Sequence, residues 1–183
     1  VGGSSNTSSF NITSNNVTIW EASTDEYYLI LAVESSNVSN KPLYFKPSDF
    51  DIVDGDGNLV DTMKAVSAYP STVIPNETGV YYDAKLSDKI LDSDMKLSAI
   101  PHIEAEISTR TNNELKQLIT TGAATGGSAN ATGFVKNISR QTIYNNVHVA
   151  IISRTSDNQV VSVMTATIGE IKPQEEVKVE VED

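Results

Sequence analysis

Alternating apolar and polar positions run along most of the chain, and this period of two predicts β-strands. Residues 27–35, YYLILAVES, place Leu29, Leu31 and Val33 on one face. Residues 177–181 alternate valine with charged residues. In FDIVDGDGNLVD, residues 50–61, two short apolar runs flank Asp-Gly-Asp-Gly-Asn, and such pairs supply the positive φ angles of a tight hairpin. The pattern therefore predicts short antiparallel strands joined by turns.

One segment fits two structures. Residues 115–121, LKQLITT, predict a strand, although residues 114–119 also fit a single short helical turn. No helix of ordinary length interrupts the strands, so the pattern indicates an all-β chain rather than an α/β fold.

The chain also repeats itself at an offset of 100 residues. The stretch NVSNKPLY begins at Asn37, and NISRQTIY begins at Asn137. At this offset the identical positions are Asn37 and Asn137, Ser39 and Ser139, Tyr44 and Tyr144, Ile52 and Ile152, Asn58 and Asn158, and Val60 and Val160. A proline turn recurs at an offset of 98, as IPNE from Ile74 and KPQE from Lys172.

These matches predict two tandem immunoglobulin-like β-sandwich domains. The first spans residues 10–108 and the second residues 109–183, since each half has the length and the strand and turn pattern of such a sandwich. Residues 1–9, rich in Gly, Ser and Asn, predict a flexible N-terminal tether.

The hairpin sequence resembles the motif that names the FxLYD domain, a prokaryotic extracytoplasmic β-sandwich module often found in tandem. The family's Phe, Leu, Tyr and Asp correspond to Phe50, Ile52, Val53 and Asp54. The stretch GFVKNISRQTIYNNVHVAIISRTSDNQVVS, with IGEIKPQEEVKVEV after it, resembles the core of the same family. This second half departs from the naming motif, with Ala150, Ile152, Ser153 and Arg154.

The first half also resembles the DUF4352-type immunoglobulin-like domains of bacterial lipoproteins, through NKPLYFKPSDFDIVDGDGN. Together the two resemblances imply an extracytoplasmic module whose marks are structural. They bring no established catalytic residues.

Charge is distributed unevenly along the chain. The net charge is −11, of which residues 1–108 carry 16 acidic and 6 basic residues and residues 109–183 carry 8 and 7. An acidic surface repels phosphate backbones and anionic lipid, so nucleic acid is excluded as a partner. It either keeps the protein in solution or attracts a cation or a basic partner.

The absence of cysteine excludes disulfides, thiolate zinc sites and cysteine nucleophiles.

Asp54, Asp56 and Asn58 form a candidate metal site. Oxygen ligands at alternate positions of a glycine-rich loop suit Ca²⁺. The bidentate Glu of an EF-hand is missing, because its position holds Ala65. The same residues also fit a plain hairpin turn, so a turn and a weak Ca²⁺ site are the two interpretations, and no other cofactor is predicted.

The tyrosines are the candidate ligand-binding residues. Aromatic residues come in adjacent pairs in the acidic half, and on a strand one member of each pair faces outward. Outward tyrosines favour contact with protein or sugar, and the alternative is cross-strand packing. The candidates are Tyr27, Tyr28, Tyr44, Tyr81 and Tyr82.

No enzyme is predicted. His102 and His148 lack the spacing of a zinc site or triad, and no nucleophile elbow occurs. The chain also contains seven Asn-x-Ser/Thr sequons, which are glycosylation sites only if the source glycosylates secreted proteins. They lie at Asn6, Asn11, Asn16, Asn37, Asn76, Asn130 and Asn137.

The sequence thus predicts a non-enzymatic binding or scaffolding module at the cell surface, secreted or lipid-anchored. Its expected partner is an envelope protein or glycan, and it would touch the membrane only through an anchor outside this sequence. A calcium-stabilised surface protein and an accessory domain of an envelope enzyme or transporter are the alternatives.

Overall fold

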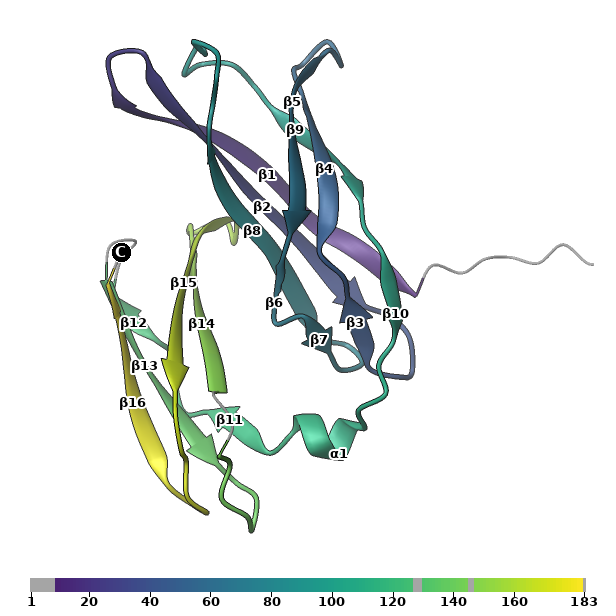
Figure 1. The fold of residues 1–183 in the computed structure, drawn as a ribbon, viewed down its shortest axis with the longest axis vertical. Coiled ribbons are helices and arrows are strands. Elements are labelled where there is room, and N and C mark those ends of the chain that lie inside the picture. The colour runs from purple at the N-terminus through teal and green to yellow at the C-terminus, as the bar shows by residue number, and fades with distance from the viewer. Residues whose placement is uncertain (1–8, 127–129, 145–146, 183) are drawn as a thin grey trace, which may run out of the picture. The chain divides into compact units, whose positions relative to one another are not determined.

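The computed structural model describes residues 9–126, 130–144 and 147–182. Of the predicted tether, residues 1–8 lie outside the described residues. The chain divides into two compact units, Val1–Thr109 (unit 1) and Arg110–Asp183 (unit 2). Nearly every element is a strand and all strand pairs are antiparallel (Figure 1), which confirms the all-β class.

Unit 1 is built from three antiparallel sheets. Their orders are β1-β2-β8-β6, β10-β3-β7 and β5-β4-β9. The strands are β1 (Phe10–Ser23), β2 (Glu26–Asn37), β3 (Leu43–Phe45), β4 (Ser48–Val53), β5 (Leu59–Val66), β6 (Ala68–Tyr69), β7 (Thr72–Val73), β8 (Thr78–Leu86), β9 (Ser98–His102) and β10 (Ala105–Ile107).

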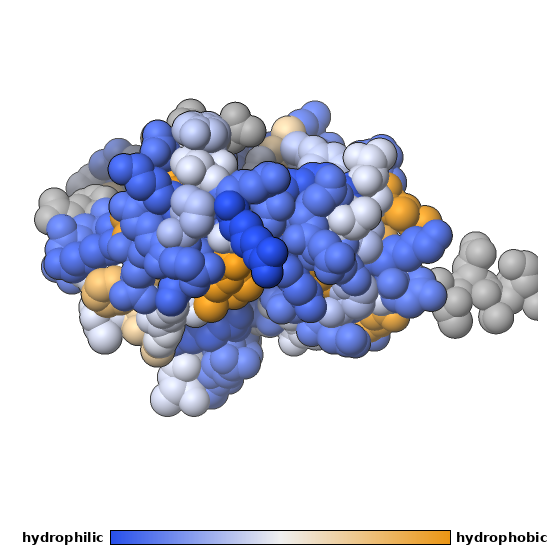
Figure 2. Space-filling view, turned by 90° about the horizontal axis from the view of Figure 1, so that it is seen from below, coloured by the Kyte–Doolittle hydropathy of each residue, from blue (hydrophilic) through white to orange (hydrophobic). Residues whose placement is uncertain are grey.

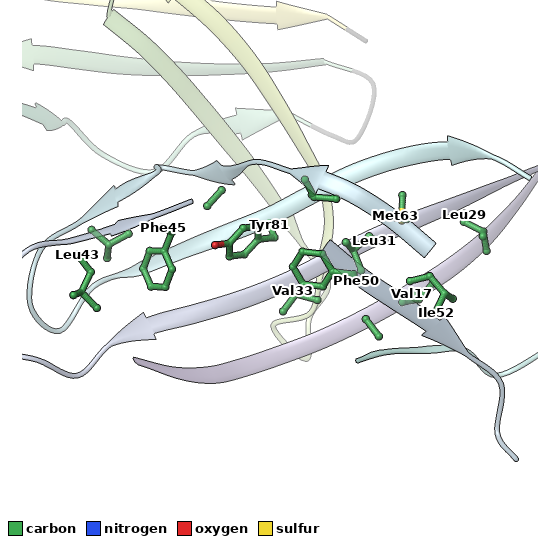
Figure 3. Close-up of a cluster of buried hydrophobic side chains, with 14 of the residues drawn as sticks. Val17, Leu29, Leu31, Val33, Leu43, Phe45, Phe50, Ile52, Met63 and Tyr81 are labelled. Atoms are coloured by element: carbon green, nitrogen blue, oxygen red, sulfur yellow. The ribbon is translucent and has the colours of Figure 1, made fainter. Parts of the chain in front are cut away.

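The core of unit 1 lies between these sheets, as Figure 3 shows. The predicted inward face of β2 is confirmed, because Leu29, Leu31 and Val33 are fully buried. Phe50 and Ile52 of β4 are fully buried opposite them. Burial of such a side chain stabilises a fold by about 1.5–3 kcal/mol, so this cluster supplies most of the driving force for folding unit 1.

Unit 2 begins with a short helix. Thr111 and Glu114 form a capping box at its N-terminus, in which each side chain accepts from the other's backbone N–H. The helix overlaps the expected helical turn of residues 114–119 only at Glu114 and Leu115, whereas the strand expected within residues 115–121 is present at residues 118–120. The elements are α1 (Asn112–Leu115), β11 (Leu118–Thr120), β12 (Thr125–Gly126), β13 (Asn130–Asn137), β14 (Val147–Arg154), β15 (Val160–Ile168) and β16 (Glu176–Glu182).

Two sheets enclose the core of unit 2. In the first, β13 pairs with β11, β12 and β16, and the second consists of β14 and β15. The buried cluster is smaller than that of unit 1 and centres on Ile171, which is fully buried. No helix of the described chain is long and apolar enough to cross a membrane.

The repeated Asn-x-Ser sequence of unit 1 forms a buried hydrogen-bond network at the end of β2. Asn37 is fully buried, and its Nδ2 donates to the carbonyl oxygens of Lys41 and Val73, both at 2.8 Å. Its Oδ1 accepts from the backbone N and the Oγ of Ser39, at 2.9 and 2.7 Å. One side chain thereby fixes the turn and ties it to β7.

Unit 2 contains the same network. Asn137 is fully buried, and its Nδ2 donates to the carbonyl oxygens of Gln141 at 2.8 Å and Ile171 at 3.0 Å. Its Oδ1 accepts from the backbone N and Oγ of Ser139, at 2.9 and 2.7 Å. The repeat seen in the sequence is thus a repeat of side-chain function.

The single offset of 100 is wrong beyond this turn. In the hairpins the N–H of Asp54 donates to the carbonyl of Asn58, and the equivalent bond runs from Thr155 to Gln159, an offset of 101. Gly57, with φ 83°, accordingly corresponds to Asn158, with φ 68°. One extra residue lies between the turn and the hairpin of unit 2, so the pairings of Ile52, Asn58 and Val60 with residues 152, 158 and 160 are coincidental. At the same offset Phe50, Ile52, Val53 and Asp54 correspond to residues 151, 153, 154 and 155, rather than to residues 150, 152, 153 and 154.

Candidate functional site

The hairpin of β1 and β2 positions the candidate surface. Its turn reverses at Asp25, which has a φ of 68°, and the Oγ of Ser23 donates to a carboxylate oxygen of Glu26 at 2.9 Å. The register that this turn sets places Trp20 directly opposite Tyr28, and β8 places Leu86 opposite Tyr28 on its other side. Directly opposed residues of antiparallel strands project from the same face.

Trp20, Tyr28 and Leu86 therefore form one row across three strands, named here the aromatic stripe. The ring centroids of Trp20 and Tyr28 lie 5.5 Å apart with an interplanar angle of 38°. The exposed fractions of Trp20 and Leu86 are 56% and 48%. On the face drawn in Figure 2, by contrast, hydrophilic residues predominate and hydrophobic residues form small separate spots. A continuous apolar row with an aromatic pair is the kind of surface that binds a partner.

Acidic residues surround the stripe. Glu21, Asp25 and Glu26 are exposed at the end of the hairpin. The neighbouring Tyr27 points to the opposite face and packs against the core. Burial raises the pKa of the Tyr27 phenol, and the negative charges of Glu21, Asp25 and Asp92 raise it further. The hairpin end thus has a negative potential, which favours partners with hydroxyl, amide or basic donors.

Tyr81 belongs to the core and not to a surface. Its side chain is fully buried, with ring centroids 6.2 Å from Phe45 and 5.2 Å from Phe50. Figure 3 shows its ring between those two residues. Its hydroxyl donates to the carbonyl of Lys46 at 2.9 Å, and burial raises the pKa of the phenol. A buried, satisfied hydroxyl of this kind serves packing.

The remaining tyrosines are separate from one another. Tyr82 is half-buried on the outer face of β8, four residues from Leu86, which is about 13 Å along a strand. Tyr44 is half-buried in β3, which belongs to a different sheet and pairs with β10 and β7. Of the five predicted tyrosines, only Tyr28 lies in the aromatic stripe.

The Asp-Gly hairpin has the geometry of a turn. One oxygen of Asp54 accepts from the backbone N of Asp56 at 3.0 Å and of Asn58 at 2.8 Å, and the other accepts from Nδ2 of Asn58 at 3.0 Å. These bonds, that from the Asn58 side chain above all, lower the pKa of Asp54. In the described residues no group of three or more His, Cys, Asp and Glu side chains is placed to hold a metal. The arrangement favours the turn over the calcium site.

A polar hollow of about 470 Å³ lies beside β3 and β4. Two of its lining residues have a carboxylate partner: Nζ of Lys46 forms an ion pair with Glu106 at 2.9 Å, and Nε2 of His102 lies 2.9 Å from an oxygen of Asp51. The other histidine, His148, contacts Thr167 through Nδ1 at 3.2 Å.

The comparisons with known proteins add no relative. No protein-family model matches the chain, and a comparison with curated proteins also finds no match. The likeness to FxLYD domains therefore rests on the motif residues of the sequence and on the repeated turn.

Sequence reasoning identified Tyr28 but missed the two exposed members of the stripe. Trp20 is the single tryptophan and alternates with Val17 and Ile19, which indicated an outward position. The pairing of Trp20 with Tyr28 and of Tyr28 with Leu86 depends on strand register, and the sequence alone did not set that register.

Proposed function

We propose that this protein is a non-enzymatic binding module of the cell envelope, made of two tandem immunoglobulin-like domains of the FxLYD type and displayed outside the cytoplasm. Unit 1 makes the contact with an envelope protein or glycan through the aromatic stripe, and unit 2 serves as its spacer or partner domain.

The two Asn turns support the tandem arrangement. The amide of Asn37 and that of Asn137 make the same four kinds of hydrogen bond, to the same positions of the turn and to the carbonyl of the residue two before the recurring proline, Val73 or Ile171. The bulge-containing hairpins of β4–β5 and β14–β15 also correspond. Such agreement in buried polar detail is expected of duplicated domains, because each network is costly to leave partly satisfied.

The observation that carries the binding role is the exposed Trp20 packed on Tyr28. Trp20 is 56% exposed and packs on Tyr28 within an apolar row, and a contiguous exposed apolar row is a candidate contact surface for a partner. Covering about 100 Å² of apolar area would stabilise a complex by about 2.5 kcal/mol, close to two orders of magnitude in affinity. The surrounding carboxylates add selectivity for partners that donate hydrogen bonds or carry positive charge.

The test compares immobilised full-length protein with a Trp20→Ser variant. Both are incubated with solubilised envelope of the source organism, and the bound proteins and glycans are identified by mass spectrometry. Ile100→Ser is the matched control, since Ile100 has a similar exposed fraction of 48% but lies on β9.

The proposal predicts a component that the wild type and the Ile100 variant retain and the Trp20 variant loses. Equal retention by all three proteins, or retention by none, would contradict it.

A further inference from the structure

The β1–β2 hairpin, which carries two of the three residues of the aromatic stripe, has no basic side chain. Residues 1–40 contain no lysine or arginine. The end of the hairpin instead exposes three carboxylates, those of Glu21, Asp25 and Glu26. The indole of Trp20 therefore lies on a strand pair whose charged side chains are all negative.

One of these carboxylates shares the face of the stripe. Side chains alternate along β2, so Glu26 projects on the same side as Tyr28, about 7 Å further toward the turn. Its Oε2 accepts from the Oγ of Ser23 at 2.9 Å. A carboxylate has about four acceptor sites, so this bond leaves capacity for a donor from a partner. An aromatic pair and a carboxylate thus stand next to each other on one exposed face.

The connection between β8 and β9 is also negative on balance. Burial, and then nearby negative charges that include Asp92 of this connection, raise the pKa of the Tyr27 phenol, so Asp92 lies beside the hairpin end. Nζ of Lys89 donates to the carbonyl of Val60 at 2.6 Å and is turned to β5. The charged residues of the connection are Asp88, Asp92, Asp94, Lys89 and Lys96.

The lysine of β8 is turned away from the stripe. Lys85 precedes Leu86, and adjacent residues of a strand project to opposite sides. Its Nζ forms an ion pair with Asp61 of β5 at 2.7 Å. The positive charge nearest in sequence to the stripe is therefore engaged on the other side of the sheet.

We propose that the partner of the aromatic stripe is a basic protein segment, with an arginine side chain lying on Trp20 and its guanidinium reaching Glu26. The inference rests on the proposed function and narrows the partner from a protein or glycan to a cationic segment of a protein. A cation within about 6 Å of an indole face is attracted by the ring. The planar guanidinium also stacks on aromatic rings and binds a carboxylate through two parallel hydrogen bonds, while its methylene stem covers apolar surface.

The charge around the stripe selects this class of partner. A neutral sugar would stack on the aromatic pair but would gain little from the negative potential, and an anionic polymer would be repelled by it. A cationic segment uses both the apolar row and the potential, which also accelerates its association.

The test uses a fluorescein-labelled peptide of arginines separated by glycine and serine, with binding to the full-length protein measured by fluorescence anisotropy. The matched probe replaces each arginine with citrulline, which has nearly the same shape and no charge. The arginine peptide should bind at least about tenfold more tightly. Raising NaCl from about 50 to about 300 mM should weaken its binding, because salt screens the attraction.

Two variants locate the contact. Trp20→Ser should weaken binding of the arginine peptide at least about tenfold, with Ile100→Ser again as its control. Glu26→Gln should weaken it about fivefold, and the glutamine keeps an oxygen for the Ser23 hydroxyl. Asp56→Asn is the matched control for Glu26, since it removes one negative charge at the exposed β4–β5 turn and should leave the dissociation constant within about twofold of the wild-type value.

Equal binding of the two peptides would overturn the inference, and so would a loss in Asp56→Asn as large as that in Glu26→Gln. Capture from solubilised envelope separates this failure from a failure of the proposed function. A component that Trp20→Ser loses and Glu26→Gln retains in full at about 300 mM NaCl would overturn the cationic partner and leave the binding role standing. Loss of no component by Trp20→Ser would contradict the binding role itself.

Discussion

Replacing Asn37 with alanine tests whether one buried amide holds the turn of unit 1. The side chain donates two hydrogen bonds and accepts two, and it is fully buried. The variant leaves two carbonyls without this donor and the N–H of Ser39 without its acceptor. At about 1 kcal/mol for each buried hydrogen bond, the free energy of unfolding should fall by about 3–4 kcal/mol. That is a large share of the roughly 5–15 kcal/mol of a typical domain.

Urea denaturation followed by fluorescence measures this loss. Trp20 is the only tryptophan and lies in unit 1, so its emission reports the unfolding of that unit. With a slope of about 2 kcal/mol per molar urea, the midpoint should fall by about 1.5–2 M. Asn40→Ala is the control, because Asn40 is exposed in the same turn and should behave as the wild type does.

The corresponding variant of unit 2 gives a second, independent reading. Asn137→Ala should lower the stability of unit 2, measured by far-ultraviolet circular dichroism, by a similar amount, because the four hydrogen bonds are the same. A midpoint for Asn37→Ala within about 0.3 M of that of Asn40→Ala would refute the reasoning, since the network would then contribute less than one hydrogen bond.

Three further predictions follow from the hairpin and the turns. The pKa of Asp54 is lowered in the folded state, so its stabilising contribution is present above the unfolded pKa and is lost as the pH falls through the folded pKa. The difference in urea midpoint between wild type and Asp54→Asn should therefore shrink from pH 6 to pH 3, and a constant difference would contradict this. A calcium site with a Kd of about 0.2 mM would raise the free energy of unfolding by about 1.4 kcal/mol at 2 mM Ca²⁺. We expect instead that the urea midpoint is the same in Ca²⁺ and in EDTA, because the Asp54 oxygens already accept hydrogen bonds. In a glycosylating host, mass spectrometry of the folded protein should find Asn37 and Asn137 unmodified, because both amides are buried and hydrogen-bonded. Asn11 and Asn76 are exposed and are accessible to modification. A glycan on either buried amide would refute the turn geometry.

The sequence predicted the strands and the core because both depend on local patterns. Period-two alternation placed Leu29, Leu31 and Val33 inside, and the Asp-Gly pairs marked the β4–β5 turn. The repeated Asn and Ser were recognised as a repeat. Their role in the hydrogen-bond network was not recognised. The carbonyl oxygens of Lys41 and Val73, which accept from Asn37, come together only when the turn and β7 meet.

Register-dependent features were missed. A fixed offset of 100 cannot represent the extra residue in unit 2, and Asn158 matches Asn58 by chance while its backbone has the role of Gly57. Each adjacent aromatic pair predicted one inward and one outward residue. Adjacency in the sequence did not indicate which residues of different strands project from the same face. Leu86 became part of the candidate surface only through its pairing with Tyr28.

The emission of Trp20 during titration with an envelope component captured by the protein tests the binding role most directly. The account predicts a saturable shift of the emission maximum to shorter wavelength and reduced quenching by acrylamide, because the exposed indole becomes covered. The shift should be unchanged in Ile100→Ser. A component that binds with full affinity while the emission and the quenching of Trp20 stay constant would show that the contact lies elsewhere, and it would contradict the proposed function of the aromatic stripe.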